Sequence, residues 1–208
     1  MSDPINHSIG GIKGHVLRRV IHVSMVFVPV IYYTQGADRA VSQSVSVLEF
    51  SSYIVLAILM IEIIRLKFRI TIIGQRKYES RQVSAFAWGA LAIWVTMLVT
   101  NFHPFTAGSG IDAGLYGIPI IFGLALVDPV MGEMRRLRGN KSAVVAGTVV
   151  SFIVWIGCHL WLATPLWVSL LLAPLTVIGE LPSVKFIDDN ATIILLPLGG
   201  LLLLSPFL

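Results

Sequence analysis

The chain has 208 residues, of which 56% are hydrophobic and only 12% are charged, and its mean hydropathy is +0.85. This composition excludes a water-soluble domain, so the net charge of +4 is interpreted as membrane topology and not as nucleic-acid binding. Several apolar runs approach the roughly 20 residues that a membrane-spanning helix requires. The sequence therefore predicts an all-α, polytopic integral membrane protein with one domain over residues 1–208.

Apolar runs separated by charged segments predict seven membrane-spanning helices. The runs lie at about 15–34, 46–67, 83–101, 112–127, 143–162, 164–178 and 191–206. The sixth run is short and contains Pro174, so we expect it to be tilted, broken or re-entrant. Seven spans place every lysine and arginine except Arg39 on one side of the membrane. The positive-inside rule makes that side cytoplasmic, with the N-terminus inside.

Polar residues inside the first two spans are the first functional candidates. His15, Arg18 and His22 recur at spacings of three and four, so they share one helix face. Glu62 lies three residues before Arg65 near the cytoplasmic end of the second span. Such side chains within a span are costly and mark functional sites. The alternatives are a structural Glu62–Arg65 ion pair and an Arg18 side chain that snorkels to the membrane surface.

Asp128 and Glu133 lie where the fourth apolar run ends. On one straight helix the two carboxylates are about 140° apart, so they converge only if the chain bends at Pro129 and Gly132. The alternative is that Asp128 caps a short helix with Pro129 at its first position.

A basic run follows these acids over residues 135–141. Within it, Arg136 and Lys141 are candidates to bind a triphosphate, and a loop that faces lipid headgroups is the alternative. The Gly-Asn-Lys-Ser sequence at 139–142 lacks the first half of the phosphate-loop motif and follows no strand, so we exclude a P-loop.

The connection between the last two spans carries a second acidic group. The connection covers residues 179–190, with Glu180 near its start and Asp188, Asp189 and Asn190 at its end. One residue suffices to cap the last helix, whereas two adjacent carboxylates repel each other unless a cation offsets their charge. Oxygen ligands without clustered His or Cys favour Mg²⁺. The predicted metal ligands are Asp128, Glu133, Asp188 and Asp189.

These motifs together resemble the CTP-dependent lipid kinases, the family of dolichol kinase, phytol kinase and CTP-dependent diacylglycerol kinase. The resemblance is carried by Arg-Arg-Val-Ile-His at 18–22, Glu-Ile-Ile-Arg-Leu at 62–66, Arg-Lys-Tyr-Glu at 76–79, Asp-Pro-x-x-Gly-Glu at 128–133, Glu-Leu-Pro at 180–182 and Asp-Asp-Asn-Ala-Thr at 188–192. The segments occur in order from the first span to the last, in a chain that is shorter than the eukaryotic dolichol kinases.

The resemblance implies Mg²⁺-assisted transfer of the γ-phosphoryl group of CTP to a membrane polyprenol, a dolichol-like alcohol. The active site is expected at the cytoplasmic face of the plasma membrane, or of the ER membrane in a eukaryote. The expected catalytic residues are His22, Glu62 and Asp128. The expected nucleotide-binding residues are Arg18, Arg136, Lys141, Glu180 and Asn190.

Two other functions fit the sequence. A cytidylyltransferase that makes a CDP-lipid would use the same donor and metal but release pyrophosphate. A transporter would carry polar residues through the bilayer midplane, whereas the polar cluster here is one-sided. The expected partners are the lipid alcohol, CTP and membrane lipids, without nucleic acid. Homo-oligomerisation and the choice of CTP over ATP stay open.

Overall fold

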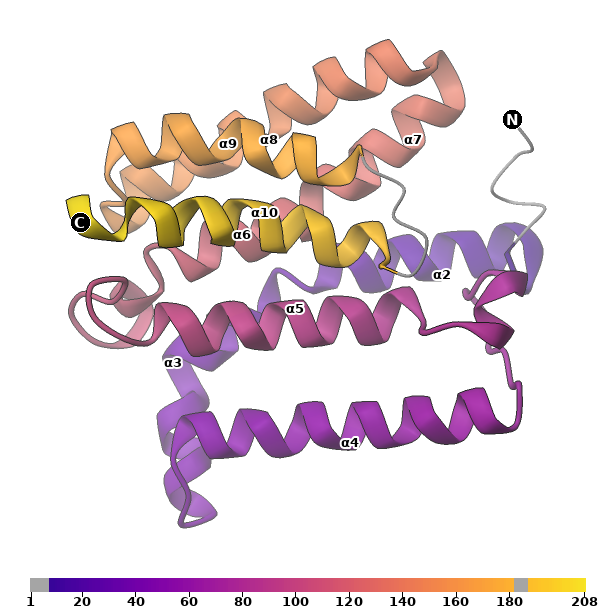
Figure 1. Ribbon diagram of the computed structural model, residues 1–208, viewed down its shortest axis with the longest axis horizontal. Coiled ribbons are helices and arrows are strands. Elements are labelled where there is room, and N and C mark those ends of the chain that lie inside the picture. The colour runs from indigo at the N-terminus through magenta and orange to yellow at the C-terminus, as the bar shows by residue number, and fades with distance from the viewer. Residues whose placement is uncertain (1–7, 182–186) are drawn as a thin grey trace.

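The computed structural model describes residues 8–181 and 187–208, and every regular element among them is a helix (Figure 1). Lys185, predicted to be cytoplasmic, lies outside the described residues. In chain order the elements are α2 (Gly11–Ser24), α3 (Phe27–Ser42), α4 (Val47–Lys67), η1 (Lys77–Arg81), α5 (Ala85–Thr100), η2 (Gly110–Gly114), α6 (Gly117–Phe122), the π-helical η3 (Gly123–Val127), α7 (Asp128–Arg138), α8 (Asn140–Leu162), α9 (Leu166–Glu180), α10 (Asp189–Leu204) and η4 (Ser205–Phe207).

The predicted all-helical architecture is confirmed, and several helices have the length and composition of membrane spans. Four qualify on their own: Val47–Lys67, Gly117–Arg138, Asn140–Leu162 and Asp189–Phe207. The bent pair α2–α3 makes a fifth if it counts as one span. The remaining apolar helices, α5 and α9, have 16 and 15 residues, fewer than a perpendicular span requires.

The first predicted span is longer than expected and is bent. α2 and α3 meet at Met25 and Val26 with an angle of 44° between them. Pro29 lies in the first turn of α3, where its ring displaces the carbonyl four residues earlier and its missing N–H removes a helical hydrogen bond.

The fourth span differs more from the prediction, because the helix does not end at residue 127. α6, η3 and α7 form one helical rod from Gly117 to Arg138. Pro129 cannot donate to the carbonyl four residues earlier, and the π-helical turn just before it absorbs this defect. Asp128 therefore has helical dihedral angles and caps nothing, so the alternative of Asp128 as an N-cap is wrong.

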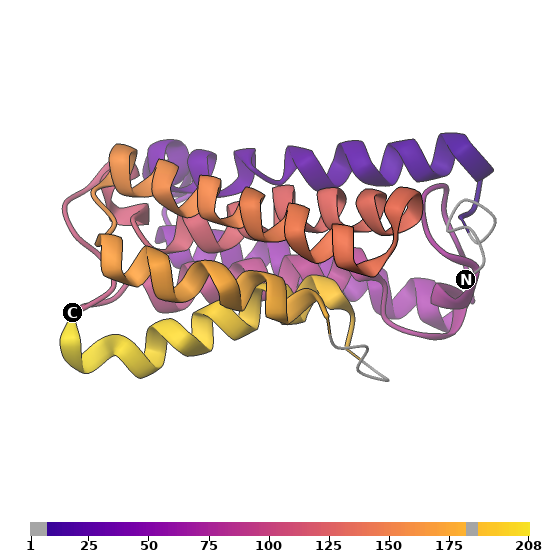
Figure 2. The ribbon, with the colours of Figure 1, turned by 90° about the horizontal axis from the view of Figure 1, so that it is seen from above.

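Most helices run roughly along a common long axis, which α3 crosses steeply, and Gly117–Val127 passes through the middle of the bundle (Figures 1 and 2). Ile118, Ile121 and Leu124 in this segment have 0% exposure. α10 packs against α9 and α5, and α8 packs against α7 and α9. α4 lies at the edge of the bundle (Figure 1).

The start of α2, the end of α4, the α7–α8 turn and the start of α10 all lie toward the same end of the bundle (Figures 1 and 2). Most arginines and lysines lie in these segments. We call this end the basic end.

Candidate functional site

Three carboxylates from distant parts of the chain meet at the basic end. Asp128 begins α7, Glu180 ends α9 and Asp189 begins α10, and one oxygen from each lies within 4.8 Å of the others. Glu180 is buried, while Asp128 and Asp189 are half-buried. The structure thus brings Asp128 and Asp189 together, as the sequence predicts, and adds Glu180. We call these three residues the carboxylate cluster.

Close packing between α9 and α10 positions two members of the cluster. A Cβ atom on Gly179 would lie 2.5 Å from the Thr192 carbonyl oxygen, so only glycine permits this approach. Asp188 caps α10 by accepting a hydrogen bond from the Asn190 backbone N–H at 3.1 Å. The Asn190 side chain donates to the Ala85 carbonyl at 2.9 Å and ties α10 to the start of α5.

Asp188 lies beside the cluster without belonging to it. Burial, together with the charge of Asp189, raises the pKa of Asp188. A raised pKa keeps a proton on this side chain at a pH where an exposed aspartate has lost its own. One proton therefore relieves the repulsion between the adjacent carboxyl groups, which the sequence analysis attributed to a cation alone.

Two arginines offset part of the negative charge of the cluster. Arg135 donates to both oxygens of Glu180, at 2.7 and 2.6 Å. Arg19 lies 3.5 Å from Asp128. Arg19 reaches this position because Gly132 has no side chain: a Cβ atom there would lie 2.2 Å from the guanidinium.

His22 lies on the other side of Asp128. Its Nε2 atom is 3.2 Å from Oδ2 of Asp128, but the alignment does not make a hydrogen bond. Within the described part of the chain, buried Nε2 of His22 and Nε of Arg19 have no hydrogen-bond partner. Buried polar atoms are nearly always paired, so these two point to a polar ligand at this place.

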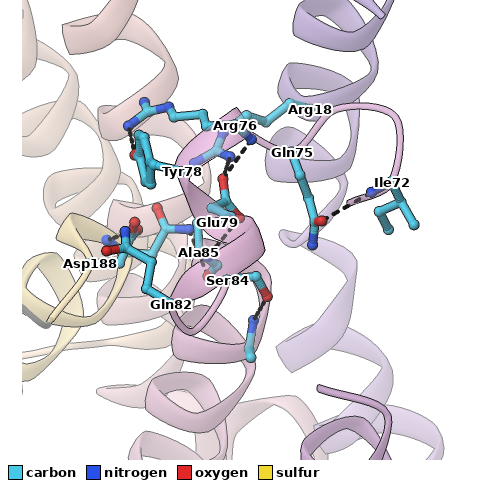
Figure 3. Close-up of polar contacts among 12 residues, drawn as sticks. Arg18, Ile72, Gln75, Arg76, Tyr78, Glu79, Gln82, Ser84, Ala85 and Asp188 are labelled. Atoms are coloured by element: carbon cyan, nitrogen blue, oxygen red, sulfur yellow. Dashed lines mark hydrogen bonds and ion pairs between the residues drawn. The ribbon is translucent and has the colours of Figure 1, made fainter. Parts of the chain in front are cut away.

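Arg18 and Arg76 add positive charge on the side of α2 and η1. Arg18 donates to Glu79 at 2.9 Å (Figure 3), and Glu79 also accepts from the Arg76 backbone N–H at 2.9 Å. The Arg76 guanidinium donates to the Tyr78 hydroxyl. Although burial lowers it, the pKa of Arg76 is raised overall by contact with Tyr78 and by the charges of Asp189 and Asp188. Arg76 therefore stays charged beside the cluster.

Glu62, predicted to be catalytic, is fully engaged in a structural network. Its two oxygens accept two hydrogen bonds from Arg65 and two from Ser84, at 2.6–3.1 Å. A carboxylate has about four lone-pair sites, so none is left for a substrate hydroxyl. Arg65 also donates to the carbonyl oxygens of Ile70, Glu79 and Gln82. This geometry favours the structural alternative, in which Glu62 and Arg65 fix the α4–α5 connection.

The structure does not bring Glu133, Arg136 and Lys141 to the cluster. Glu133 pairs with Arg136 and lies 3.7 Å from His15, on the outer side of α7. Lys141 is exposed in the first turn of α8. The bend at Pro129 and Gly132 that convergence would need does not form, so Glu133 stays about 140° around the helix from Asp128. Glu133 is therefore not among the carboxylates that converge in the described part of the chain.

The predicted site residues did not include Arg19, Arg76, Glu79 or Arg135. Arg135 follows Asp128 by seven residues, which places both on one face of a continuous helix. That spacing could have identified Arg135 if the helix had been expected to pass through Pro129. Glu79 entered the sequence analysis only as the last residue of the Arg-Lys-Tyr-Glu segment, and its exposure is only 1%.

His22 also lines an apolar cavity. It has a volume of about 350 Å³ and lies between α2, α4, α5 and the α4–α5 connection. His22, Arg18, Glu62 and Asn190 contribute to its polar end, and isoleucines such as Ile21 and Ile61 line the rest. His22 is therefore shared by the apolar cavity and the carboxylate cluster.

The donor set of the cluster fits a hard divalent cation. Carboxylate oxygens from three different helix ends converge, and Mg²⁺ prefers such ligands. Within the described residues, Asp189 has no ion-pair partner of its own, although Arg76 and Arg18 lie within electrostatic range. Asp128, Glu180 and Asp189 are the residues that would hold the ion.

Comparison of the chain with protein-family models, with curated proteins and with solved structures gives no match.

Proposed function

We propose that this protein is a CTP-dependent lipid kinase that phosphorylates a membrane polyprenol at the cytoplasmic face. The main support is the position of His22, which lies between three converging carboxylates and an apolar cavity. Phosphoryl transfer to a lipid alcohol needs such a junction, because the acceptor is apolar and the donor is a polyanion. The proposal includes seven spans with the N-terminus inside, and thus counts α5 and α9 as short spans that a locally thinner bilayer accommodates.

Phosphoryl transfer needs positioning and charge neutralisation more than covalent chemistry. Mg²⁺ held by Asp128, Glu180 and Asp189 would supply part of that neutralisation when bound. Arg18, Arg19, Arg76 and Arg135 surround the cluster and supply the rest. These four arginines replace Arg136 and Lys141 as the side chains that bind the triphosphate.

In this proposal His22 accepts the proton of the acceptor hydroxyl as the hydroxyl oxygen attacks the γ-phosphorus. Its Nε2 atom has no hydrogen-bond partner among the described residues, so it is available for this role. Asp128 lies 3.2 Å away and stabilises the imidazolium that results. Asn190 orients the acceptor from α10, while Glu62 keeps the wall of the cavity in place.

The test is a transfer assay with purified protein in nanodiscs, with γ-labelled CTP or γ-labelled ATP as donor and polyprenol or diacylglycerol as acceptor. The proposal expects label from CTP in polyprenyl phosphate, with CDP as the second product. Asp189→Asn should abolish transfer, whereas Asp112→Asn, an exposed aspartate in η2, should leave it unchanged. Full activity of Asp189→Asn would rule out the cluster as the reaction centre.

The same assay with α-labelled CTP tests the cytidylyltransferase alternative. That enzyme would leave the α-label in the lipid and release pyrophosphate, and this result would replace the kinase proposal. A protein that consumes no nucleotide with any acceptor would contradict both enzymes.

A further inference from the structure

A second apolar cavity continues from the one beside His22. It has a volume of about 330 Å³ and lies between α3, α4 and α5. Three residues line both cavities: Met25 at the α2–α3 bend, Ile58 on α4 and Phe86 on α5. The two cavities therefore adjoin, and these three side chains form the neck between them.

The combined cavities follow nearly the whole length of α4. Lining residues on this helix extend from Arg65 at the basic end to Val47 at the opposite end. That separation corresponds to a rise of roughly 27 Å, close to the roughly 30 Å of a bilayer's hydrocarbon core. We call this path the α4 groove.

The α4 groove is also open to the lipid side of the bundle. Ile54, Ile61 and Phe86 line it, yet 49%, 66% and 50% of their surfaces are exposed. α4 lies at the bundle edge (Figure 1), and these exposed apolar side chains give a molecule dissolved in the bilayer access to the groove. Most of the lining is apolar: polar groups gather at His22 and its neighbours, and the second cavity adds only Tyr32, Arg39 and Ser51, so the groove fits a hydrocarbon chain that ends in a hydroxyl.

We propose that the α4 groove binds the single prenyl tail of the acceptor alcohol and that its neck sets the chain length the enzyme accepts. The hydroxyl lies beside His22, and the tail runs through the neck toward Val47. This inference rests on the proposed function only where it places the hydroxyl beside His22. A chain that ends before the neck fills only the first cavity, and a longer chain must pass Met25, Ile58 and Phe86.

The substitution Ile58→Trp tests the neck. It should raise KM for a long polyprenol by at least about tenfold relative to KM for geraniol, because only the long tail must pass the new side chain. Leu56→Trp is the matched control: Leu56 is on the same helix, is 56% exposed and lines neither cavity. Phe86→Ala widens the neck and should shift the preference toward longer chains. Equal KM ratios in wild type and Ile58→Trp would overturn the inference even if the enzyme is an active kinase.

A second readout does not depend on catalysis. A polyprenol with a diazirine at the far end of its tail is photolysed with wild-type protein in nanodiscs, and the labelled peptides are identified by mass spectrometry. We expect labelling of α3 and α4 near Tyr32 and Phe50, and its loss in Ile58→Trp but not in Leu56→Trp. Labelling elsewhere, or labelling that Ile58→Trp leaves unchanged, would overturn the inference. A protein that labels as expected but transfers no phosphate would contradict the kinase proposal and keep the groove.

Discussion

The two halves of the bundle are packed differently. In the half made of α6 to α10, large inward-facing side chains such as Trp155, Ile193 and Leu124 have 0% exposure, and residues such as Leu160 are exposed on its outer face. In the half made of α2 to α4, side chains such as Ile61 and Phe27 are 66% and 62% exposed. The first half holds all three members of the carboxylate cluster, and the second contributes most of the walls of the α4 groove. Converging charges need fixed positions, whereas a lipid needs a surface that it can enter.

His22 lies where these halves meet. Single substitutions in each half and at His22 can therefore test the comparison. The tightly packed half should respond to substitution with lost chemistry. The open half should respond with altered stability or altered choice of lipid.

The largest effect is expected in the tightly packed half. Asp128→Asn removes a carboxylate from the cluster and the charge that faces His22 and Arg19, so transfer activity should fall below detection. The assay is phosphoryl transfer in nanodiscs, together with calorimetric titration of Mg²⁺, which should lose its binding signal. Unchanged Mg²⁺ binding would show that the metal, if it acts, is held elsewhere.

The next largest effect is expected at the junction. His22→Gln keeps a polar side chain but removes the proton acceptor, so kcat should fall by about 10²- to 10⁴-fold with KM for CTP nearly constant. Single-turnover kinetics separate this loss from slow product release. A change in KM for CTP alone would make His22 a nucleotide-binding residue.

Glu62→Gln should act on stability in the open half. It leaves the buried Arg65 guanidinium without its ion partner, which costs about 3 kcal/mol when such a pair is broken. Thermal unfolding in detergent measures this cost, with exposed Asp38→Asn as control. A variant that is fully stable but inactive would return Glu62 to the catalytic role that the sequence predicted.

A smaller effect is expected from Gly132→Ala. The added Cβ would lie 2.2 Å from the Arg19 guanidinium and push it away from Asp128, so activity should fall about tenfold. Gly157→Ala on α8 is the matched control, because a Cβ there meets nothing within 4 Å. Equal activity of the two variants would show that Arg19 does not need its present position.

The smallest effect is expected from Lys141→Ala, which changes an exposed side chain outside the cluster. Activity should stay within about twofold of wild type. A large loss would restore Lys141 as a phosphate-binding residue.

Much of the fold could be predicted from the sequence, because apolar runs of membrane length define the helices. The position of Asp189 beside Asp128 also followed from topology, since both lie where spans end on the basic side. The continuation of the helix through Pro129 could not be predicted, because it depends on a π-helical turn that the residue pattern does not encode. The same continuous helix places Arg135 inside the site and Glu133 outside it. The burial of Glu79 depends on Arg18 from another helix, and short-range patterns carry no information about such contacts.

The π-helical turn at Gly123–Val127 has a consequence for how the gene can change. Such a turn holds one residue more than an α-helical turn, and each helical residue advances the chain by about 100°. Deleting a single codon there would leave an ordinary α-helical turn, which keeps Asp128 and Arg135 on about their present face but sets the Pro129 ring against the carbonyl four residues earlier. One-residue deletions in this turn should therefore be tolerated in evolution mainly together with replacement of Pro129.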